Sequence, residues 1–102
     1  MSSTAEAVLR LLGLARRAGK LYVGSGSVMR ALVRERPGVV FVARDAGRDV
    51  LRRVERSRGE NTLDQQTFEA ADLAAAFGRE KLAVVSIHDS QFVAGVQKAL
   101  SK

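Results

Sequence analysis

The sequence predicts one α/β domain over residues 1–102, a three-layer α/β/α sandwich whose middle layer is a small mixed sheet of about four strands. Three observations support this fold class. Segments with apolar residues at helical spacing alternate with short apolar runs, and the last segment is helical. Two of the runs, 39–43 and 82–87, are almost wholly apolar, which is typical of strands covered on both faces. A chain of 102 residues can also bury one hydrophobic core without disulfides or metal.

The first half of the chain is predicted to contain two helices and two strands. Residues 5–17 place apolar side chains at helical spacing, with charged side chains on the opposite side. Residues 20–23 are typical of a short strand, and the glycine/serine loop 24–27 follows it. A second helix is predicted to begin at Val28, with one of the two loop serines as its cap. A proline-glycine pair then breaks the chain before the buried strand 39–43.

The second half continues the alternation. A helix is predicted over about 47–58, with arginines along its outer side. The polar stretch 62–68 forms at best a short edge strand. A fourth helix begins at Glu69 or Asp72, and the buried strand 82–87 follows it. An aspartate-serine pair caps the final helix.

Positive charge is concentrated in the first part of the chain. Residues 1–58 hold 13 of the 17 basic residues and 5 acidic ones, whereas residues 59–102 hold 4 basic and 6 acidic residues. Thirteen of the basic residues are arginines, whose planar guanidinium matches phosphate and stacks on bases. This composition favours a nucleic-acid partner. A GC-rich genome and solvated helix faces are the alternative explanation.

The glycine/serine loop is the strongest local signal for a ligand. Glycines let the backbone approach a ligand closely, and the first amide groups of a helix point toward anions at its positive dipole end. Arg30 would flank a phosphate bound there. The loop is neither a P-loop, because no Gly-Lys-Ser/Thr follows, nor a dinucleotide fingerprint, because Met29 replaces the third glycine. An ordinary strand-to-helix turn is the alternative interpretation.

Basic residues supply the second signal. A first set brackets the loop in sequence and consists of Arg10, Arg16, Arg17, Lys20, Arg30 and Arg34. The cations at the end of the first helix also complement its dipole, which is a purely structural use. A second set recurs every four residues and is interpreted as a solvated helix face: Arg48, Arg52 and Arg56.

No enzymatic chemistry is predicted. His88, Asp89 and Ser90 are the residue types of a hydrolase triad, but neighbours in sequence do not converge as triad members do. One histidine and no cysteine leave no transition-metal site, and no cofactor is expected. Most of the few aromatic residues fall on inward positions, which disfavours a base-stacking platform. Because no transmembrane run and no signal peptide are evident, we expect a cytoplasmic protein without membrane contact.

The run from Leu12 to Gly24, Leu-Gly-Leu-Ala-Arg-Arg-Ala-Gly-Lys-Leu-Tyr-Val-Gly, resembles the opening of the bacterial YlxQ-type proteins. These belong to the ribosomal L-seven-Ae superfamily of kink-turn RNA binders. The resemblance continues in order through the helix from Val28, the strand ending at Asp45, the helix before Gly78 and the start of the last helix, nearly the whole chain. It implies the three-layer α/β/α fold with RNA bound at one end.

The superfamily reads the sheared G·A pairs of a kink-turn with a Gly-x-Asn-Glu segment, followed three residues later by a phosphate-binding cation. Gly24 and Arg30 match the glycine and the cation, whereas Gly26 and Ser27 stand where asparagine and glutamate are expected. A loop before the last strand covers a flipped-out nucleotide, and its positions are occupied here by Gly78, Arg79, Glu80 and Lys81. The departure implies binding through backbone amides and arginines that is less selective and more salt-sensitive.

The sequence hypothesis is therefore a non-enzymatic, ribosomal-protein-like monomer that docks on structured RNA, kink-turns among them, in the setting of ribosomal RNA or the ribosome. The loop would cradle the RNA backbone with Gly24, Ser25, Gly26 and Ser27. Phosphates would be neutralised by Lys20, Arg30 and Arg34, with Gly78, Arg79 and Lys81 closing from the second loop and Arg16 and Arg17 further out. The alternatives are a protein-interaction adaptor that kept the fold and lost RNA recognition, and a basic domain that binds any nucleic acid.

Overall fold

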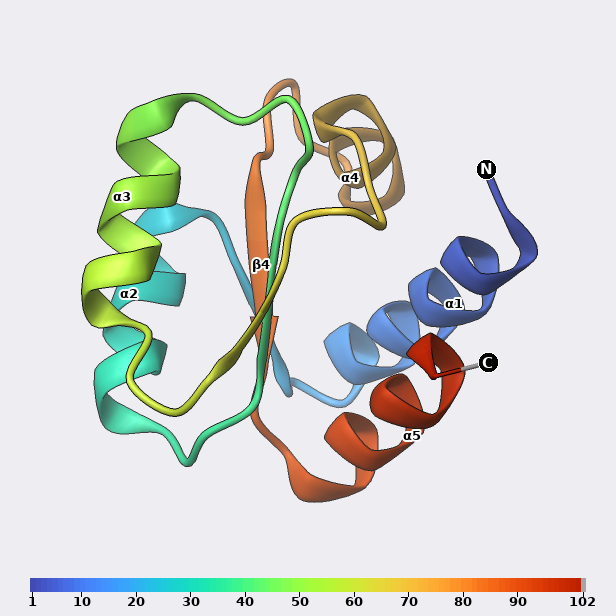
Figure 1. The fold of residues 1–102 in the computed structure, drawn as a ribbon. Helices are drawn as coiled ribbons and strands as arrows, with labels where there is room; N and C mark the ends of the chain where they lie inside the picture. Colours follow the sequence, from blue (N-terminus) through green and yellow to red (C-terminus); the bar gives the residue numbers. More distant parts are fainter. Residues whose placement is uncertain (102) are drawn as a thin grey trace.

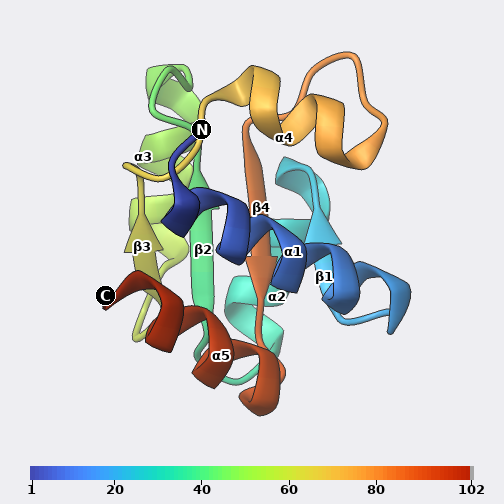
Figure 2. The same cartoon turned by 90° about the vertical axis from the view of Figure 1, so that its right-hand side faces the viewer.

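The middle layer of the molecule is a four-stranded mixed sheet (Figure 1). In the computed structural model, which describes residues 1–101, the strands are β1 (Leu21–Val23), β2 (Val39–Val42), β3 (Thr62–Asp64) and β4 (Val84–Ile87). Their order across the sheet is β1-β4-β2-β3. β2 runs parallel to β3, and β4 is antiparallel to both of its neighbours (Figure 2). The small mixed sheet that the sequence predicts is confirmed.

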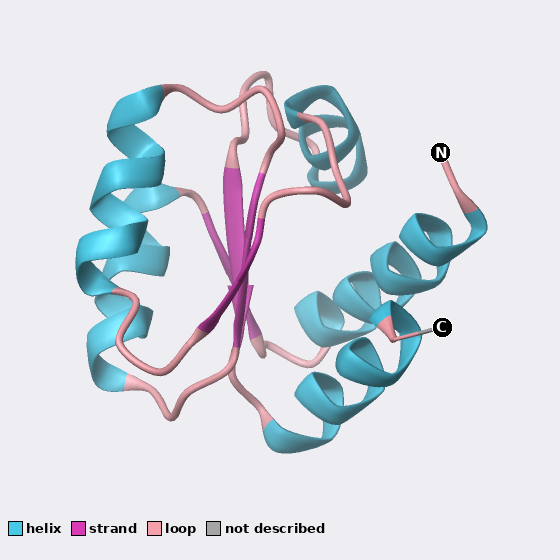
Figure 3. Ribbon diagram, viewed as in Figure 1, coloured by secondary structure: helices cyan, strands magenta, loops and turns pink. Residues whose placement is uncertain are grey.

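Helices cover both faces of this sheet. One face carries α2 (Ser25–Arg34) and α3 (Arg48–Ser57), and the other carries α1 (Ser3–Arg17), α4 (Ala70–Phe77) and α5 (Ser90–Leu100) (Figure 3). α1 and α5 lie side by side in both views (Figures 1 and 2). Within residues 1–101, none of the helices combines the length and the apolar character needed to traverse a lipid bilayer.

Side chains of β2 alternate between the two cores. Val39 and Phe41 are buried with residues of α1, α4 and α5, whereas Val40 and Val42 are buried with residues of α2 and α3. Because successive strand residues point to opposite faces, an uninterrupted apolar run is what a strand covered on both sides requires. The prediction that this run is a doubly covered strand is confirmed.

Helix starts follow the predicted capping residues in α4 and α5. Asp89 is the N-cap of α5 and accepts hydrogen bonds from the backbone amides of Gln91 and Phe92. In α4 the N-cap is Glu69, and its backbone amide donates to Asp72 Oδ2 at 3.0 Å. Both acidic residues considered as the start of α4 therefore take part in its capping.

The predicted start of α2 is wrong. The helix begins at Ser25 rather than Val28, and its N-cap is Gly24, which provides no side-chain hydrogen bond. Neither loop serine caps the helix, because both lie inside its first turn. Helical geometry from Ser25 onward is possible because Gly24 alone absorbs the change of chain direction, with φ +89° and ψ 158°.

The polar stretch after α3 is mostly turn, as its weak pattern suggested. Only Thr62–Asp64 pairs with β2, and it forms the edge strand β3. The chain then turns around the Asp64 carboxylate, which accepts hydrogen bonds from the backbone amides of Gln66 and Thr67 and from the Thr67 hydroxyl. This turn leads the chain across the end of the sheet into α4.

Candidate nucleic-acid interface

The start of α2 and the turn after α4 meet at one end of the sheet. β1 ends beside the beginning of β4, because the Gly24 amide donates to the Val84 carbonyl oxygen at 3.0 Å. The segment between α4 and β4 immediately precedes Val84, so the antiparallel pairing of β1 with β4 places both connections together. The connection between β2 and α3 reaches the same end, as the Ala43 amide bonds to the Ala83 carbonyl oxygen at 2.8 Å.

These three connections enclose a hollow of about 630 Å³, which we call the tip groove. Its polar and charged lining comes from Ser25, Asp45, Arg79, Glu80 and Lys81. Apolar lining comes from α3, α4 and the start of β4, mainly Ala46, Val50, Ala70, Ala71, Ala74, Leu82 and Val84. The groove thus combines charged groups with an apolar surface built largely of small side chains.

Backbone amides at the start of α2 are available to a ligand. The first amide groups of a helix have no partner within it, and Gly24 has no side chain to satisfy them. The positive end of the helix dipole lies at the same place, so the amides of Ser25, Gly26 and Ser27 favour an anion. α3 begins at the same groove, and its N-cap Gly47 also lacks a side-chain cap.

Two arginines flank the first turn of α2. A Cβ atom on Gly24 would lie 3.7 Å from Arg79 Nη1, and one on Gly26 would lie 3.7 Å from Arg30 Nη1. Both guanidinium groups therefore lie at contact distance from the backbone of this turn. A phosphate bound by the helix amides would therefore have positive charge next to it, from α2 itself and from the turn after α4.

Hydrogen bonds fix α4, and with it the turn that carries Arg79. Asp45 Oδ1 accepts from the Ala70 amide at 2.8 Å at the beginning of the helix. At its end, Arg16 Nη1 donates to the Phe77 carbonyl oxygen at 2.9 Å, and the guanidinium lies over the Phe77 ring. Gly78 ends the helix in the left-handed conformation with φ +65°. Arg16, predicted as an outer phosphate contact, thus links α1 to α4.

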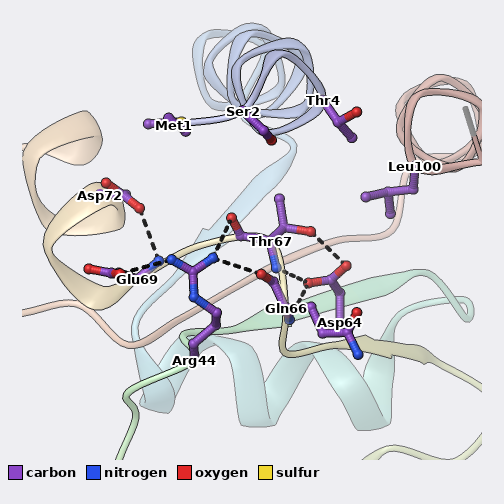
Figure 4. Close-up of a pocket in the computed structure, with 10 residues that line it drawn as sticks. All are labelled: Met1, Ser2, Thr4, Arg44, Asp64, Gln66, Thr67, Glu69, Asp72 and Leu100. Carbon is purple, nitrogen blue, oxygen red and sulfur yellow. Dashed lines mark hydrogen bonds and ion pairs between the residues drawn. The ribbon is translucent and has the colours of Figure 1, made fainter.

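Arg44 links the end of β2 to the segment that leads into α4 (Figure 4). Its guanidinium donates to the carbonyl oxygens of Gln66 and Thr67, at 2.8 Å and 3.3 Å, and pairs with Glu69 Oε1 at 2.9 Å. Figure 4 shows a second hollow, separate from the tip groove, and the polar groups that line it bond mainly to one another: Arg44, Asp64, Gln66, Thr67, Glu69 and Asp72. This cluster therefore stabilises the entry to α4 and offers a ligand little unpaired charge.

Charges inside the tip groove are balanced. Arg79 and Lys81 contribute two positive charges, and Asp45 and Glu80 contribute two negative ones. Asp45 was not predicted as a site residue, although its place in the short connection between the buried strand and the next helix was an available signal. Net positive potential at this end must come from basic residues around the groove, of which Arg30 is one.

The other predicted site residues divide between the groove and the far end of the molecule. Gly24, Ser25, Arg79 and Lys81 line the groove. Gly26 and Ser27 lie in the first turn of α2, with Arg30 one turn further along, and Gly78 forms the α4 cap. Arg17 is exposed at the end of α1.

Lys20 and Arg34 were predicted with this group, but the structure places both away from it. Lys20 precedes β1 and lies 4.0 Å from Asp89 Oδ2, at the end of the sheet opposite to Gly24. Arg34 lies in the last turn of α2, nine residues after Ser25 and so about 13 Å along the helix axis. The two ends of a strand or of a helix lie at opposite ends of the sheet, so residues close in sequence can be far apart in space.

The histidine of the chain is structural. His88 is buried, and its Nδ1 lies 2.9 Å from the Arg36 carbonyl oxygen while Nε2 lies 3.0 Å from Ser86 Oγ. A carbonyl only accepts, so Nδ1 carries the proton and Nε2 accepts from the serine hydroxyl. Burial lowers the pKa of His88, against the opposing effects of the Arg36 carbonyl and the Glu35 charge.

The neighbouring residues complete a polar cluster at this far end. The Tyr22 ring meets His88 edge-on. The pKa of Tyr22 is raised, mainly by burial and to a smaller extent by the nearby Glu35 carboxylate. Asp89 caps α5 and does not orient the His88 ring. No grouping of three or more metal-ligating side chains is found within residues 1–101.

The chain matches known proteins in fold but not in sequence. No protein-family model and no curated protein sequence matches the chain. A solved structure of a protein with unknown function from Bacillus halodurans matches with a TM-score of 0.80 and 24% identity, covering 93% of this chain and 97% of that one. A 15.5kD RNA binding protein from Giardia lamblia matches with a TM-score of 0.74 and 17% identity, covering 99% and 91% respectively. This chain has the fold of these two proteins, and the predicted L-seven-Ae-like fold class is confirmed.

Proposed function

We propose that this chain is a non-enzymatic RNA-binding protein that holds structured RNA in the tip groove. The observation that carries the proposal is the meeting of two elements far apart in sequence. The start of α2, with its amides lacking a side-chain cap, lies beside the turn that carries Arg79 and Lys81. The phosphate backbone would bind the amides of Ser25 and its neighbours, with Arg30 and Arg79 on either side.

The apolar lining of the groove supports a further part of the proposal. Small side chains such as Ala46 and Ala74 leave a shallow surface beside the charged groups. An unstacked nucleobase is flat and largely apolar on its faces, and proteins recognise RNA mainly at such splayed-out bases. We propose that one base leaves the RNA stack and lies on this surface, with the backbone on either side of it held by the arginines.

Similarity to known proteins supports the same partner. The Giardia protein that shares the fold is an RNA binding protein. The sequence resemblance to YlxQ-type proteins points to structured RNA of the kink-turn kind, in a cytoplasmic and ribosomal setting. Gly26 and Ser27 lack the reach of asparagine and glutamate, and each missing base-edge contact costs about 1–3 kcal/mol of discrimination. We therefore propose that the protein reads RNA shape and backbone more than base identity. We also propose that it binds as a monomer.

The proposal is tested by titrating labelled kink-turn RNA, an unbent RNA duplex and a DNA duplex with the protein at several salt concentrations. Kink-turn RNA is expected to bind tightest, and Arg79→Ala and Arg30→Ala are each expected to weaken that binding about threefold to tenfold. Arg10→Ala is the matched control, because Arg10 is exposed on α1, on the other face of the sheet. It removes the same charge at a distance from the groove.

Two outcomes contradict the proposal in different ways. Equal and steeply salt-dependent binding to all three nucleic acids would mean a basic domain without preference for RNA. Failure to bind any of them near physiological salt would leave the protein-interaction adaptor as the function. Equal weakening by Arg79→Ala and Arg10→Ala would locate the binding outside the tip groove.

A further inference from the structure

α3 carries a row of arginines on the side that faces away from the sheet. The opposite side of the helix is apolar, and its Val54 is fully buried against the α2 layer. The row recurs every four residues, so its members point in nearly the same direction, and all three are exposed: Arg48, Arg52 and Arg56. The row extends about 12 Å along the helix, a length over which one strand of a duplex presents about three phosphates.

These arginines are not neutralised by the protein. Two ion pairs are formed within residues 1–101, and neither includes a residue of α3. Asp49 and Glu55 are the acidic residues of the helix, and they flank the row without pairing with it at salt-bridge distance. α3 therefore presents four arginines against two carboxylates, a surface that attracts a polyanion.

The row begins at the tip groove. Gly47 and Val50 line the groove, so Arg48 lies at its edge, and the helix then runs away from it along the outside of the sandwich (Figure 1). α2 packs beside α3 and starts at the same groove, and its Arg30 is exposed next to the groove as well. A nucleic acid seated in the groove can thus continue onto α3 without leaving the surface.

The charge balance of the groove limits its own attraction for RNA. The two cations that line the groove are matched by two carboxylates, so the groove alone provides little long-range attraction for a phosphate chain. We infer that a double-helical RNA stem leaving the tip groove lies along α3, with Arg48, Arg52 and Arg56 against the phosphates of one strand. This inference rests on the proposed function, and it adds a duplex stem of sufficient length to the RNA that the protein recognises.

The test compares two RNAs and two double variants. The RNAs share one kink-turn core and differ in one stem, which is either short or extended by a full helical turn. Arg52→Ala/Arg56→Ala removes two cations from α3, and both positions are exposed, so alanine preserves the helix. Arg10→Ala/Lys98→Ala removes the same charge from α1 and α5, on the opposite face of the sheet.

For the long-stem RNA, the α3 variant is expected to bind about tenfold more weakly than wild type. The slope of log Kobs against log salt is expected to become shallower by about 0.9 for each arginine removed. The short-stem RNA is expected to bind wild type and the α3 variant with equal affinity. The control variant is expected to bind both RNAs nearly as tightly as wild type does.

The outcomes separate this inference from the proposed function. Wild-type binding that depends on Arg79 but is unchanged in the α3 variant would overturn the inference and leave the proposed function standing. Equal loss in the α3 and control variants would also overturn it, because net charge alone would then explain the effect. Absence of RNA binding by wild type would overturn both.

Discussion

Replacement of Gly24 by alanine is expected to destabilise the protein and to weaken its binding of RNA, whereas the same replacement at Gly47 is expected to do neither. Both glycines are N-caps of helices that start at the tip groove, and neither provides a side-chain hydrogen bond. Their backbones differ. Gly24 has φ +89° and ψ 158°, a region that only glycine enters readily, whereas Gly47 has φ −66° and ψ 156°, which any residue adopts.

The expected difference in the free energy of unfolding is what remains after the effects common to both substitutions cancel. Each adds one methyl group and restricts the unfolded chain equally, so the stabilisation of about 0.4–1 kcal/mol from that source cancels in the comparison. The loss of glycine at an N-cap cancels as well. Crowding does not contribute, because a Cβ on Gly24 meets Arg79 Nη1 at 3.7 Å and one on Gly47 meets nothing within 4 Å. The remaining difference is backbone strain, about 1–3 kcal/mol.

Urea unfolding followed by circular dichroism measures this difference, with both variants and wild type at one pH. The Gly24→Ala protein is expected to have the lower free energy of unfolding and an unchanged m-value. Its RNA affinity is also expected to fall, because relief of the strain turns the first amides of α2 away from the groove. Equal free energies of unfolding for the two variants would refute the argument from backbone strain.

Four further predictions concern other parts of the molecule. Gly38→Ala is expected to cost about 3 kcal/mol or more in thermal or urea unfolding, because its Cβ would overlap the Ile87 carbonyl oxygen at the end of β4; an unchanged stability would contradict this packing. Folding lowers the pKa of His88, so below about pH 6.5 the unfolded chain binds more protons than the folded chain does. The free energy of unfolding is therefore expected to fall as the pH is lowered through this range. In His88→Asn this part of the pH dependence is expected to disappear, and its persistence would assign it to another group. Asp45→Asn keeps an oxygen that can accept from α4 but removes a negative charge from the groove, so RNA is expected to bind about twofold to fivefold tighter at low salt, and unchanged affinity would place the RNA elsewhere. Gly26→Asn combined with Ser27→Glu is expected to raise kink-turn affinity about tenfold, and no gain over wild type in the same titration would count against the matched register.

Local patterns were sufficient to predict most of the fold. The apolar run 39–43 is doubly covered, because valines on both sides of β2 enter separate cores. Asp89 and Glu69 cap the helices that follow them, since capping depends only on residues two or three positions apart. The start of α2 was the exception. It depends on a positive φ at Gly24, and the sequence does not distinguish that conformation from a loop closed by a serine cap.

The candidate site was predicted less completely, because its members come together through topology. The association of Gly24 with Arg79 depends on the pairing of β1 with β4, which the resemblance implied but the residue pattern did not specify. Lys20 was misplaced because it lies only four residues before Gly24, yet at the opposite end of a strand. Asp45 was not assigned to the site, because its hydrogen bond to the start of α4 joins residues 25 positions apart.

The two glycines at the start of α2 differ in what the backbone requires of them. Gly24 is required by its backbone angle, whereas Gly26 lies within the helix, where a Cβ would meet Arg30 Nη1 at 3.7 Å, an ordinary van der Waals contact. A guanidinium there contributes charge and a planar surface but cannot accept hydrogen bonds from base edges. Asparagine and glutamate, which the L-seven-Ae superfamily carries at these positions, can accept them. Under the proposed function, selectivity must then come from the path of the RNA backbone. A bent RNA can bring one stretch of phosphates to the amides of α2 and another to the arginines of α3 at once, so the bend itself becomes the feature that the protein recognises.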